Sequence, residues 1–217
     1  MDVKTAKEIT GGLSKTTKMP GGSYSLPAGC CGTGSLLCGI KGSVCEGCYA
    51  RKGRYRMPNV VNAMDERREG LSREEWSDAM VSLISRQKCP YFRWHDSGDL
   101  QGTWHMKKII EVSERLKGYK FFLPTKEYTV VSEVLENMEL PSNMVIRLGA
   151  PMVNVPFEES GISDVLLSMV VTPDKMDLAE KAGAHLCPAT ANPDQKTCGR
   201  CRMCWNEKCG SIAYVKH

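Results

Sequence analysis

The sequence lacks long hydrophobic runs. No apolar stretch approaches the roughly 20 residues that a membrane-spanning helix needs. The opening residues, MDVKTAKEIT, contain no apolar segment of the kind found in a secretory signal. We therefore expect a cytoplasmic protein with no membrane partner. Thiols stay reduced in that compartment, so a disulfide framework is not expected.

The chain is also poor in net charge, and it has no internal repeat and no segment that resembles a linker between domains. Its net charge of +4 permits contact with nucleic acid but does not argue for it. The 217 residues, 41% of them hydrophobic and 25% charged, suit one globular domain with a real core. Cysteine is the residue present in excess, because eleven cysteines in a reducing compartment indicate metal sites.

Five cysteines lie in the glycine-rich stretch 29–50. Four glycines between Cys31 and Cys45 let the backbone fold back and bring distant thiols together. Cys45 and Cys48 form a C-x-x-C pair whose sulfurs can reach one metal ion or cluster, and Cys31 is the natural third ligand. Thiolates select zinc, copper(I) or iron–sulfur clusters, and the spacing leaves the metal open. The other thiols of this loop are Cys38, a reserve fourth ligand, and Cys30, which diverges from its neighbour.

A second group of cysteines lies near the C-terminus and gives the strongest local signal. The C-x-x-C-x-x-C spacing within it is the spacing of [4Fe–4S] ferredoxin loops. Tetrahedral zinc held by four thiolates is the alternative. We favour iron–sulfur here, because three such closely spaced thiols suit several corners of a cubane cluster. The four candidate ligands are Cys187, Cys198, Cys201 and Cys204.

Strand-like and helix-like patterns alternate along the middle of the chain, which predicts an α/β protein with parallel strands and right-handed crossovers. Six such units are too few for a complete eight-unit barrel. We therefore predict an incomplete (β/α)6 barrel, with an open doubly wound sheet as the second choice. Strands are expected at 23–26, 91–95, 119–123, 143–149, 164–171 and 184–186, and helices at 59–68, 72–87, 104–117, 130–138 and 172–183.

Three parts are expected along the chain. Residues 1–22, rich in Lys, Thr and Gly, form a flexible lead-in. Residues 23–186 form the partial α/β barrel together with the first cysteine loop. Residues 187–217 form a C-terminal cysteine-rich, metal-binding extension. In parallel α/β folds functional groups gather at the carboxyl ends of the strands, so both cysteine groups are expected on one rim.

The sequence HDSGD follows the second expected strand at this rim. Asp96 and Asp99 can accept hydrogen bonds from an ammonium or hydroxyl group, and His95 can transfer a proton. Gly98 allows a tight turn and the close approach of a ligand. A turn in which Asp99 caps the next helix explains the five residues equally well.

Two basic side chains also fall at strand ends. Lys126 follows an apolar strand and is a candidate cation for an anionic group, which adds it to His95, Asp96 and Asp99 as a candidate catalytic residue. Arg147 interrupts a buried strand, where a charge needs a partner. That partner is either one of the two aspartates or the carboxylate of a ligand.

A basic and aromatic segment, YARKGRYR, follows the first cysteine loop. A solvated surface is its ordinary explanation. The alternative is a surface that binds nucleic acid or a nucleotide, because Arg and Lys contact phosphates and Tyr stacks on bases. Its basic residues are Arg51, Lys52, Arg54 and Arg56, and its tyrosines are Tyr49 and Tyr55.

The stretches GSVCEGCYARKGRY, FRWHDSGDL, LPTKEY, IRLGAP and CGRCRMCW resemble the gene product 88 family of phages and mobile elements, from about Tyr24 onward. This resemblance implies a phage or plasmid setting, and the host cytosol as the compartment if a phage encodes the protein. It implies little about biochemistry.

A wider resemblance is to radical S-adenosylmethionine (SAM) enzymes. Those have a partial barrel in which three cysteines after the first strand hold a [4Fe–4S] cluster with one iron open to SAM. By this resemblance Cys31, Cys45 and Cys48 hold the cluster and Tyr49 packs beside them. The usual C-x3-C-x2-C spacing is C-x13-C-x2-C here.

The same resemblance assigns further residues. A Gly-Gly-Glu-like turn after the second strand binds the amino group of SAM, and the equivalent residues here are Ser97, Gly98 and Asp99. The C-terminal cysteines are similar to auxiliary-cluster extensions, so one or two clusters and an external electron donor are implied. Arg147 joins these as a candidate for binding a cofactor carboxylate.

Three functions follow from these patterns. The first is an iron–sulfur enzyme of the radical SAM type acting on an unknown substrate. The second is a non-catalytic, metal-stapled module that binds nucleic acid. The third resembles the tRNA-guanine transglycosylases: a barrel enzyme of nucleobase exchange with Asp96 or Asp99 as nucleophile and structural zinc at the C-terminal site.

Overall fold

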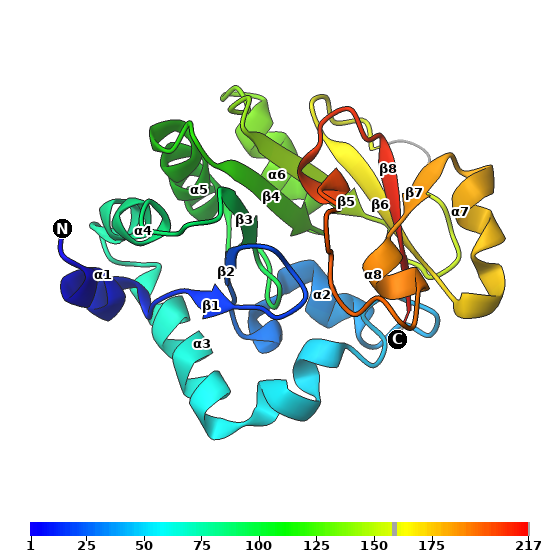
Figure 1. The fold of residues 1–217 in the computed structure, drawn as a ribbon, viewed down its shortest axis with the longest axis horizontal. Helices are drawn as coiled ribbons and strands as arrows, with labels where there is room; N and C mark the ends of the chain where they lie inside the picture. Colours follow the sequence, from blue (N-terminus) through cyan, green and yellow to red (C-terminus); the bar gives the residue numbers. More distant parts are fainter. Residues whose placement is uncertain (158–159, 217) are drawn as a thin grey trace.

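The computed structural model describes residues 1–157 and 160–216. Its centre is an eight-stranded sheet (Figure 1). The order across the sheet is β1-β2-β3-β4-β5-β6-β8-β7. The strands are β1 (Ser14–Lys15), β2 (Gly22–Tyr24), β3 (Tyr91–Trp94), β4 (Lys120–Thr125), β5 (Met144–Gly149), β6 (Leu166–Val171), β7 (Ala184–Leu186) and β8 (Ser211–Val215).

The predicted α/β class is confirmed. All neighbouring strands from β2 to β7 are parallel, and only β1 runs antiparallel to its neighbour. From β1 to β6 the order in space follows the order in the chain, so this part has no reversal of the kind that defines a doubly wound sheet. The sheet is open, because β1 and β7 are its two edges.

The helices are short and connect successive strands. Among the described residues none is long and apolar enough to cross a membrane. They are α1 (Val3–Thr10), α2 (Gly32–Leu37), α3 (Pro58–Gly70), α4 (Trp76–Ile84), α5 (Thr103–Arg115), α6 (Tyr128–Leu135), α7 (Asp177–Lys181) and α8 (Pro188–Ala191).

The main core lies between helices α4, α5 and α6 and the face of the sheet that they cover, here called the outer face; the opposite face is called the inner face. Successive side chains of a strand point to opposite faces, so Phe92 and Trp94 of β3 lie on one face together with Phe121 and Leu123 of β4. These residues are buried in one cluster with apolar residues of α4, α5 and α6. Trp76 of α4 packs 6.0 Å from Trp94, measured between ring centroids.

The inner face of the sheet is covered differently. Arg93 of β3 and Phe122 of β4 are register partners on this face, and the guanidinium carbon of Arg93 lies 5.5 Å from the centre of the Phe122 ring. Trp205 contacts the same ring and donates a hydrogen bond of 2.9 Å from Nε1 to the carbonyl oxygen of Phe92. The segment 187–210 thus crosses the sheet face that the core helices leave free (Figure 1).

Arg147 of β5 attaches this C-terminal segment to the sheet. Its side chain is fully buried, and its nitrogens donate to six backbone carbonyls at 2.8–3.4 Å. The sequence offered Asp96, Asp99 or a ligand as its partner. Neither aspartate is one, because the acceptors are backbone carbonyls. The acceptors are the carbonyl oxygens of Leu167, Met203, Cys204, Asn206, Cys209 and Gly210.

Residues 1–22, predicted from the sequence to be a flexible lead-in, contain α1 and β1. Asp2 caps α1 by accepting hydrogen bonds from the amides of Lys4 and Thr5, and Ala6 is fully buried. The hydroxyl of Tyr24 donates to the carbonyl oxygen of Thr10 at 2.6 Å. The polar composition hid a short amphipathic helix that packs on α4.

Other differences are local. The helix expected at 72–87 begins later, since the Ser72 hydroxyl donates back to the carbonyl of Glu69 and α4 begins only at Trp76. The strand expected at 119–123 extends through Pro124, because β4 continues to Thr125. Strands β1 and β8 were not predicted from the sequence.

Replacing Arg147 with Met should lower the free energy of unfolding by about 3 kcal/mol or more, because several buried carbonyls lose their donors. Urea denaturation measures this loss, and limited proteolysis should cut the variant within 203–210. Lysine has fewer donors than arginine, so the free energy of unfolding of Arg147→Lys should lie between those of the unmodified protein and Arg147→Met. The matched control is Arg73→Met, at an exposed arginine, which should be nearly neutral. An Arg147→Met variant as stable as the control would contradict the attachment.

Candidate functional site

Three thiols of the first cysteine loop lie in one neighbourhood. The loop leaves the carboxyl end of β2, forms α2 and returns before α3. A Cβ on Gly34 would lie 3.6 Å from Sγ of Cys31 and 3.7 Å from Sγ of Cys45, so both sulfurs border the same glycine. The thiol of Cys48 also interacts electrostatically with both. The predicted set of Cys31, Cys45 and Cys48 is thus brought together.

Acidic groups crowd around this set. Burial raises the pKa of Cys31 to about 12, and the charges of Asp99, Cys48, Cys45 and Glu127 act in the same direction. Burial also raises the pKa of Cys45, while Lys126 opposes that shift. A cation among these groups would reverse their mutual repulsion and favour the thiolates. The donor chemistry therefore fits a bound metal centre.

Cys38 is held apart from the set. Its thiol donates a hydrogen bond of 3.3 Å to the backbone carbonyl of Cys45, so it contacts the chain rather than the space between the other sulfurs. Cys30 contributes its backbone to the loop: its carbonyl oxygen accepts from Nε2 of Gln101 at 3.1 Å.

Asp99 lies beside the cysteine loop and is held by β4. Its carboxylate accepts from the Thr125 hydroxyl at 2.6 Å and from the amide of Lys126 at 3.0 Å. Burial raises its pKa to about 6, against these hydrogen bonds. The alternative that Asp99 caps α5 is not what the structure has, because α5 begins after Gly102 without a side-chain cap. The Lys126 ammonium lies 2.9 Å from where a Cβ on Gly149 would be.

The turn after β3 packs against the end of β2. Gly98 has φ of +79°, and a Cβ there would lie 2.5 Å from Cβ of Leu26, so only glycine fits. Ser97 donates its hydroxyl to the carbonyl of Leu26 at 2.8 Å. This turn therefore binds the loop-bearing strand to β3.

The carboxylate of Asp96 is occupied by the protein. It accepts hydrogen bonds from the hydroxyls of Ser23 at 2.6 Å, Ser25 and Tyr55 at 3.1 Å. The hydroxyl of Tyr49 donates to the backbone carbonyl of Asp96 at 2.6 Å. Asp96 thus fixes the basic segment against the inner face of the sheet.

His95 does not join the cysteines. It has φ of +52°, and its ring packs 5.3 Å from the ring of His105 on α5, between centroids. Both side chains are buried, and neither ring nitrogen of His95 has a hydrogen-bond partner among the described residues. Burial lowers the pKa of His95 to about 3, and Arg93 acts in the same direction. His95 is therefore neutral and lies in the layer between sheet and helix.

The C-terminal cysteines form a second group on the inner face. Cys198 interacts electrostatically with Cys187 and Cys201, and burial raises its pKa. Sγ of Cys204 lies 3.3 Å from the Tyr214 hydroxyl, and burial raises the pKa of Cys204 to about 11. The four predicted ligands are thus neighbours.

His185 belongs to this group and was missed from the sequence. Its Nε2 lies 3.8 Å from Sγ of Cys201. His185 is in β7, two residues before Cys187, so both point to the same face of the sheet. The spacing H-x-C was the available signal. It was too short to be distinctive among eleven cysteines.

The sequence predicted both cysteine groups on the rim at the carboxyl ends of the strands. For the second group this prediction holds only in part. Cys187 directly follows the carboxyl end of β7. Cys204, however, lies over the sheet, because Arg147 donates to its carbonyl and the next residue packs on Phe122. Arg147, predicted to bind a cofactor, is used instead to position this segment.

Neither group is closed around a single ion. Within 1–157 and 160–216, no three His, Cys, Asp or Glu side chains are placed to hold one metal ion. Zinc bonded to thiolates at about 2.3 Å needs its sulfurs only about 4 Å apart.

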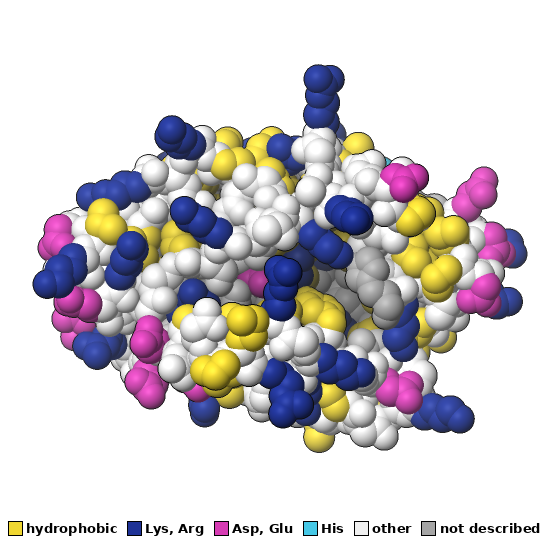
Figure 2. Space-filling view, turned by 60° about the horizontal axis from the view of Figure 1, so that its bottom comes forward, with side chains coloured by type: hydrophobic (Ala, Val, Ile, Leu, Met, Phe, Trp, Pro, Cys, Tyr) yellow, Lys and Arg dark blue, Asp and Glu magenta, His cyan; other side chains and the backbone are white. Residues whose placement is uncertain are grey.

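The basic segment is partly used within the protein. Tyr49 and Tyr55 contact each other at 5.7 Å between ring centroids, and both hydroxyls bond to Asp96. Arg51 donates to the carbonyl of Ala28 and the hydroxyl of Ser35. In the face drawn in Figure 2, Lys and Arg side chains gather around a hollow.

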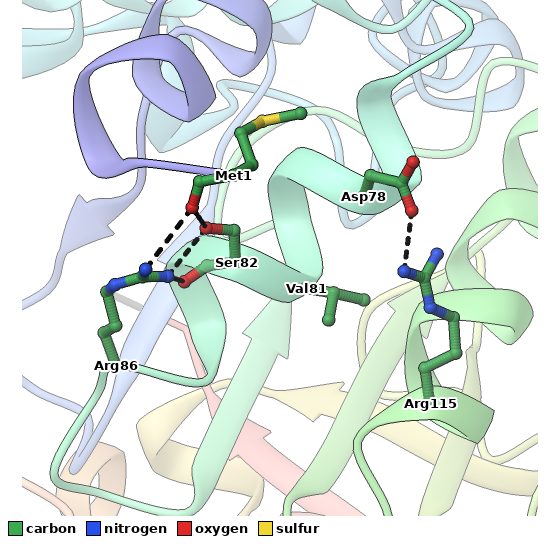
Figure 3. A pocket seen from close by; sticks show the side chains of 6 residues that line it. All are labelled: Met1, Asp78, Val81, Ser82, Arg86 and Arg115. Atoms are coloured by element: carbon green, nitrogen blue, oxygen red, sulfur yellow. Dashed lines mark hydrogen bonds and ion pairs between the residues drawn. The ribbon is translucent and has the colours of Figure 1, made fainter.

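A separate surface pocket of about 400 Å³ lies between α4, α5 and the first residue of the chain (Figure 3). Its two arginines are already paired. Arg115 contacts Asp78 at 2.6 Å, and Arg86 donates to Ser82 and to the carbonyl of Met1. None of the predicted site residues lines this pocket.

The buried histidines should make stability depend on pH. An unfolded histidine binds a proton below its ordinary pKa of about 6.5, whereas the folded state keeps His95 and His105 neutral. The free energy of unfolding should therefore fall as pH drops below about 6.5, by about 2 kcal/mol per histidine at pH 5. Urea titrations at several pH values measure this.

The matched variant is His95→Asn, because Asn tolerates a positive φ and does not titrate. It should reduce the slope of stability against pH between 5 and 6.5. An unchanged slope would show that His95 does not contribute.

No curated protein and no solved structure matches the chain. A comparison with protein families matches residues 2–207 to the family described as Gene product 88. The match includes both cysteine groups and begins earlier than the resemblance seen in the sequence. It covers nearly the whole chain, and the protein therefore belongs to the gene product 88 family.

Proposed function

We propose that this protein is an iron–sulfur enzyme of the radical SAM type. The observation that carries the proposal is the meeting of Cys31, Cys45 and Cys48 at the carboxyl end of β2, with the fourth thiol, Cys38, bonded to the backbone. Three ligands on a four-iron cluster leave one iron free for a substrate or cofactor. A fourth protein ligand would occupy that iron.

The unusual spacing is compatible with this role. The additional residues between Cys31 and Cys45 form α2 and the turn after it, and they return Cys45 to the glycine that Cys31 borders. The Glu127 carboxylate holds the start of α2 by accepting from the amide and hydroxyl of Thr33, both at 2.9 Å. We infer that the longer loop can supply the three thiols in place of the shorter spacing.

When bound, a [4Fe–4S] cluster with an open iron would supply, with an external electron donor, the electron for the reductive chemistry of SAM. The chain's own residues would position the partners. The rigid turn after β3 packs against Leu26 at the end of β2, and it contains Ser97, Gly98 and Asp99. Lys126 lies near Cys45 and Asp99 and offers a cation at the same edge.

We propose a second cluster at the C-terminal group, on Cys187, Cys198, Cys201 and Cys204. Arg147 fixes the backbone of this segment, and Tyr214 contacts Cys204. The alternative occupant is structural zinc, for which His185 beside Cys201 would be an additional ligand.

The other two functions have weaker support. A nucleic-acid module would use the basic segment, but both of its tyrosines are bonded to Asp96. A nucleobase-exchange enzyme would need a free carboxylate nucleophile, and the oxygens of Asp96 and Asp99 accept several internal hydrogen bonds.

Protein purified without oxygen should be brown, with broad visible absorption, and should contain iron and sulfide. The variant in which Ala replaces Cys198, Cys201 and Cys204 should lose the iron of one cluster. The replacement of Cys89, which lies in neither group, is the matched control and should keep all of it. Colourless protein with stoichiometric zinc would refute the proposal.

The N-terminal loop decides whether the cluster is open. Cys38→Ala should retain the iron of both clusters, whereas Cys31→Ala, Cys45→Ala or Cys48→Ala should each lose one. Added SAM should change the electron paramagnetic resonance spectrum of the reduced protein, and dithionite should then release 5′-deoxyadenosine. If Cys38→Ala loses the cluster and SAM leaves the spectrum unchanged, the protein is a structural iron–sulfur protein instead.

A further inference from the structure

We propose that the basic segment 49–56 binds the phosphates and one base of a single-stranded nucleic acid. This deepens the proposed function, because it names the class of substrate, and it rests on that function only for calling the bound strand a substrate. Three features of the segment support the surface itself: its charge, its exposure and its anchoring to the protein.

Positive charge is concentrated in this segment. The whole chain has 29 basic and 25 acidic residues, yet no acidic residue lies between Glu46 and Asp65. Arg51 donates to the carbonyl of Ala28 and the hydroxyl of Ser35. The other three basic side chains are exposed, and no described residue forms an ion pair or a hydrogen bond with them: Lys52, Arg54 and Arg56. These cations are therefore available to phosphates.

Hydrogen bonds to Asp96 hold the segment in a fixed orientation. Tyr55 is half-buried and donates to the carboxylate of Asp96 at 3.1 Å, while Arg54 and Arg56 on either side of it are exposed. The hydroxyl of Tyr49 donates to the backbone carbonyl of Asp96 at 2.6 Å. The cations thus project from a rigid support, which lowers the entropic cost of ordering them on a charged backbone.

The same anchoring orients a ring on which a base can stack. Burial raises the pKa of the Tyr49 hydroxyl, whereas the residue as a whole remains 60% exposed. The ring of Tyr55 contacts it at 5.7 Å between centroids. Stacking uses the face of the ring and not the hydroxyl, so the bond to Asp96 leaves this role open and fixes the ring for it.

The segment lies beside the first cysteine group. It follows Cys48 directly, and Nζ of Lys52 lies 3.2 Å from where a Cβ on Gly47 would be. In Figure 1 the chain between α2 and α3 forms the lower edge of the molecule, and Figure 2 turns this edge toward the viewer. A strand bound here would pass next to the proposed cluster.

A single strand uses more of this surface than other polyanions do. The base faces of a duplex are stacked within it, so a duplex would meet the cations but not the ring of Tyr49. The carboxylates of an acidic protein would pair with the same cations and would also leave the ring without a base. Both are outcomes that the experiments must separate.

The first test measures the fluorescence anisotropy of labelled strands of about 12 nucleotides with the full chain purified without oxygen. Oligothymidylate and oligouridylate distinguish DNA from RNA. With three phosphate contacts, the logarithm of the affinity should fall against the logarithm of the salt concentration with a slope of about −2, a roughly twentyfold loss between about 50 and 200 mM. Oligothymidylate annealed to its complement should bind more weakly. No binding of either strand, equal or tighter binding of the duplex, or equal binding of polyglutamate would overturn the proposal.

The second test assigns the binding to the segment. A triple replacement by Gln should remove most of the salt dependence: Lys52→Gln, Arg54→Gln and Arg56→Gln. The matched control neutralises three exposed basic residues outside the segment, two of them near the amino end of β4, and should keep the slope: Arg73→Gln, Lys117→Gln and Lys120→Gln. An unchanged slope in the first variant, or an equal loss in the control, would overturn the assignment.

The third test separates stacking from anchoring. Tyr49→Leu removes the ring and should lower the affinity for oligothymidylate roughly fivefold or more, whereas Tyr49→Phe keeps the ring and should lose less. Equal affinities in both variants and the unmodified protein would refute stacking. If Tyr49→Leu does not fold, photocrosslinking of a bromouridine-containing strand to the unmodified protein decides. The crosslinked peptide should contain Tyr49, and its absence from the crosslinked peptides would overturn the proposal.

None of these measurements needs iron. Strand binding by a colourless protein would refute the cluster and keep the surface. A brown protein that releases 5′-deoxyadenosine from SAM but binds no strand would refute the surface and keep the enzyme.

Discussion

The arrangement of the whole inner face depends on one buried cation. Arg147 interrupts an apolar strand, and a buried guanidinium is tolerated only when its donors are satisfied. The backbone between 203 and 210 supplies five of the six acceptors. The arginine and the segment therefore require each other. Their pairing fixes where the second cysteine group lies.

Alternation of patterns made most of the fold predictable. The expected strands at 91–95, 119–123, 143–149, 164–171 and 184–186 overlap β3 to β7, because each is an apolar run bounded by turn residues. Strand β8 was hidden by its position after the cysteines, where short runs look like part of a metal-binding loop. Its insertion between β6 and β7 is a long-range pairing that no local pattern encodes.

The candidate site was predictable in residue type but not in partners. Spacing identified the cysteines of both groups, because ligands close in sequence are constrained to be close in space. It did not reveal that Cys38 bonds to the backbone, that Asp96 is surrounded by hydroxyls, or that His95 turns toward α5. Those outcomes depend on side-chain directions set by the turn after β3. His95 itself has a positive φ in that turn, which directs its ring to the outer face of the sheet.

The turn after β3 also supports the first cysteine loop. Because a side chain at Gly98 would collide with Leu26, the turn after β3 must press on the end of β2, and β2 leads directly into the first cysteine loop. Ser97 and Leu26 add reciprocal hydrogen bonds, with the amide of Leu26 donating to the carbonyl of Ser97 at 2.8 Å. The same rigid turn positions Asp99 beside Cys31 and sends Asp96 to the inner face, where it meets the basic segment. A loop of flexible composition is thus held in one place by its neighbours, which is the condition for three distant thiols to act as one ligand set.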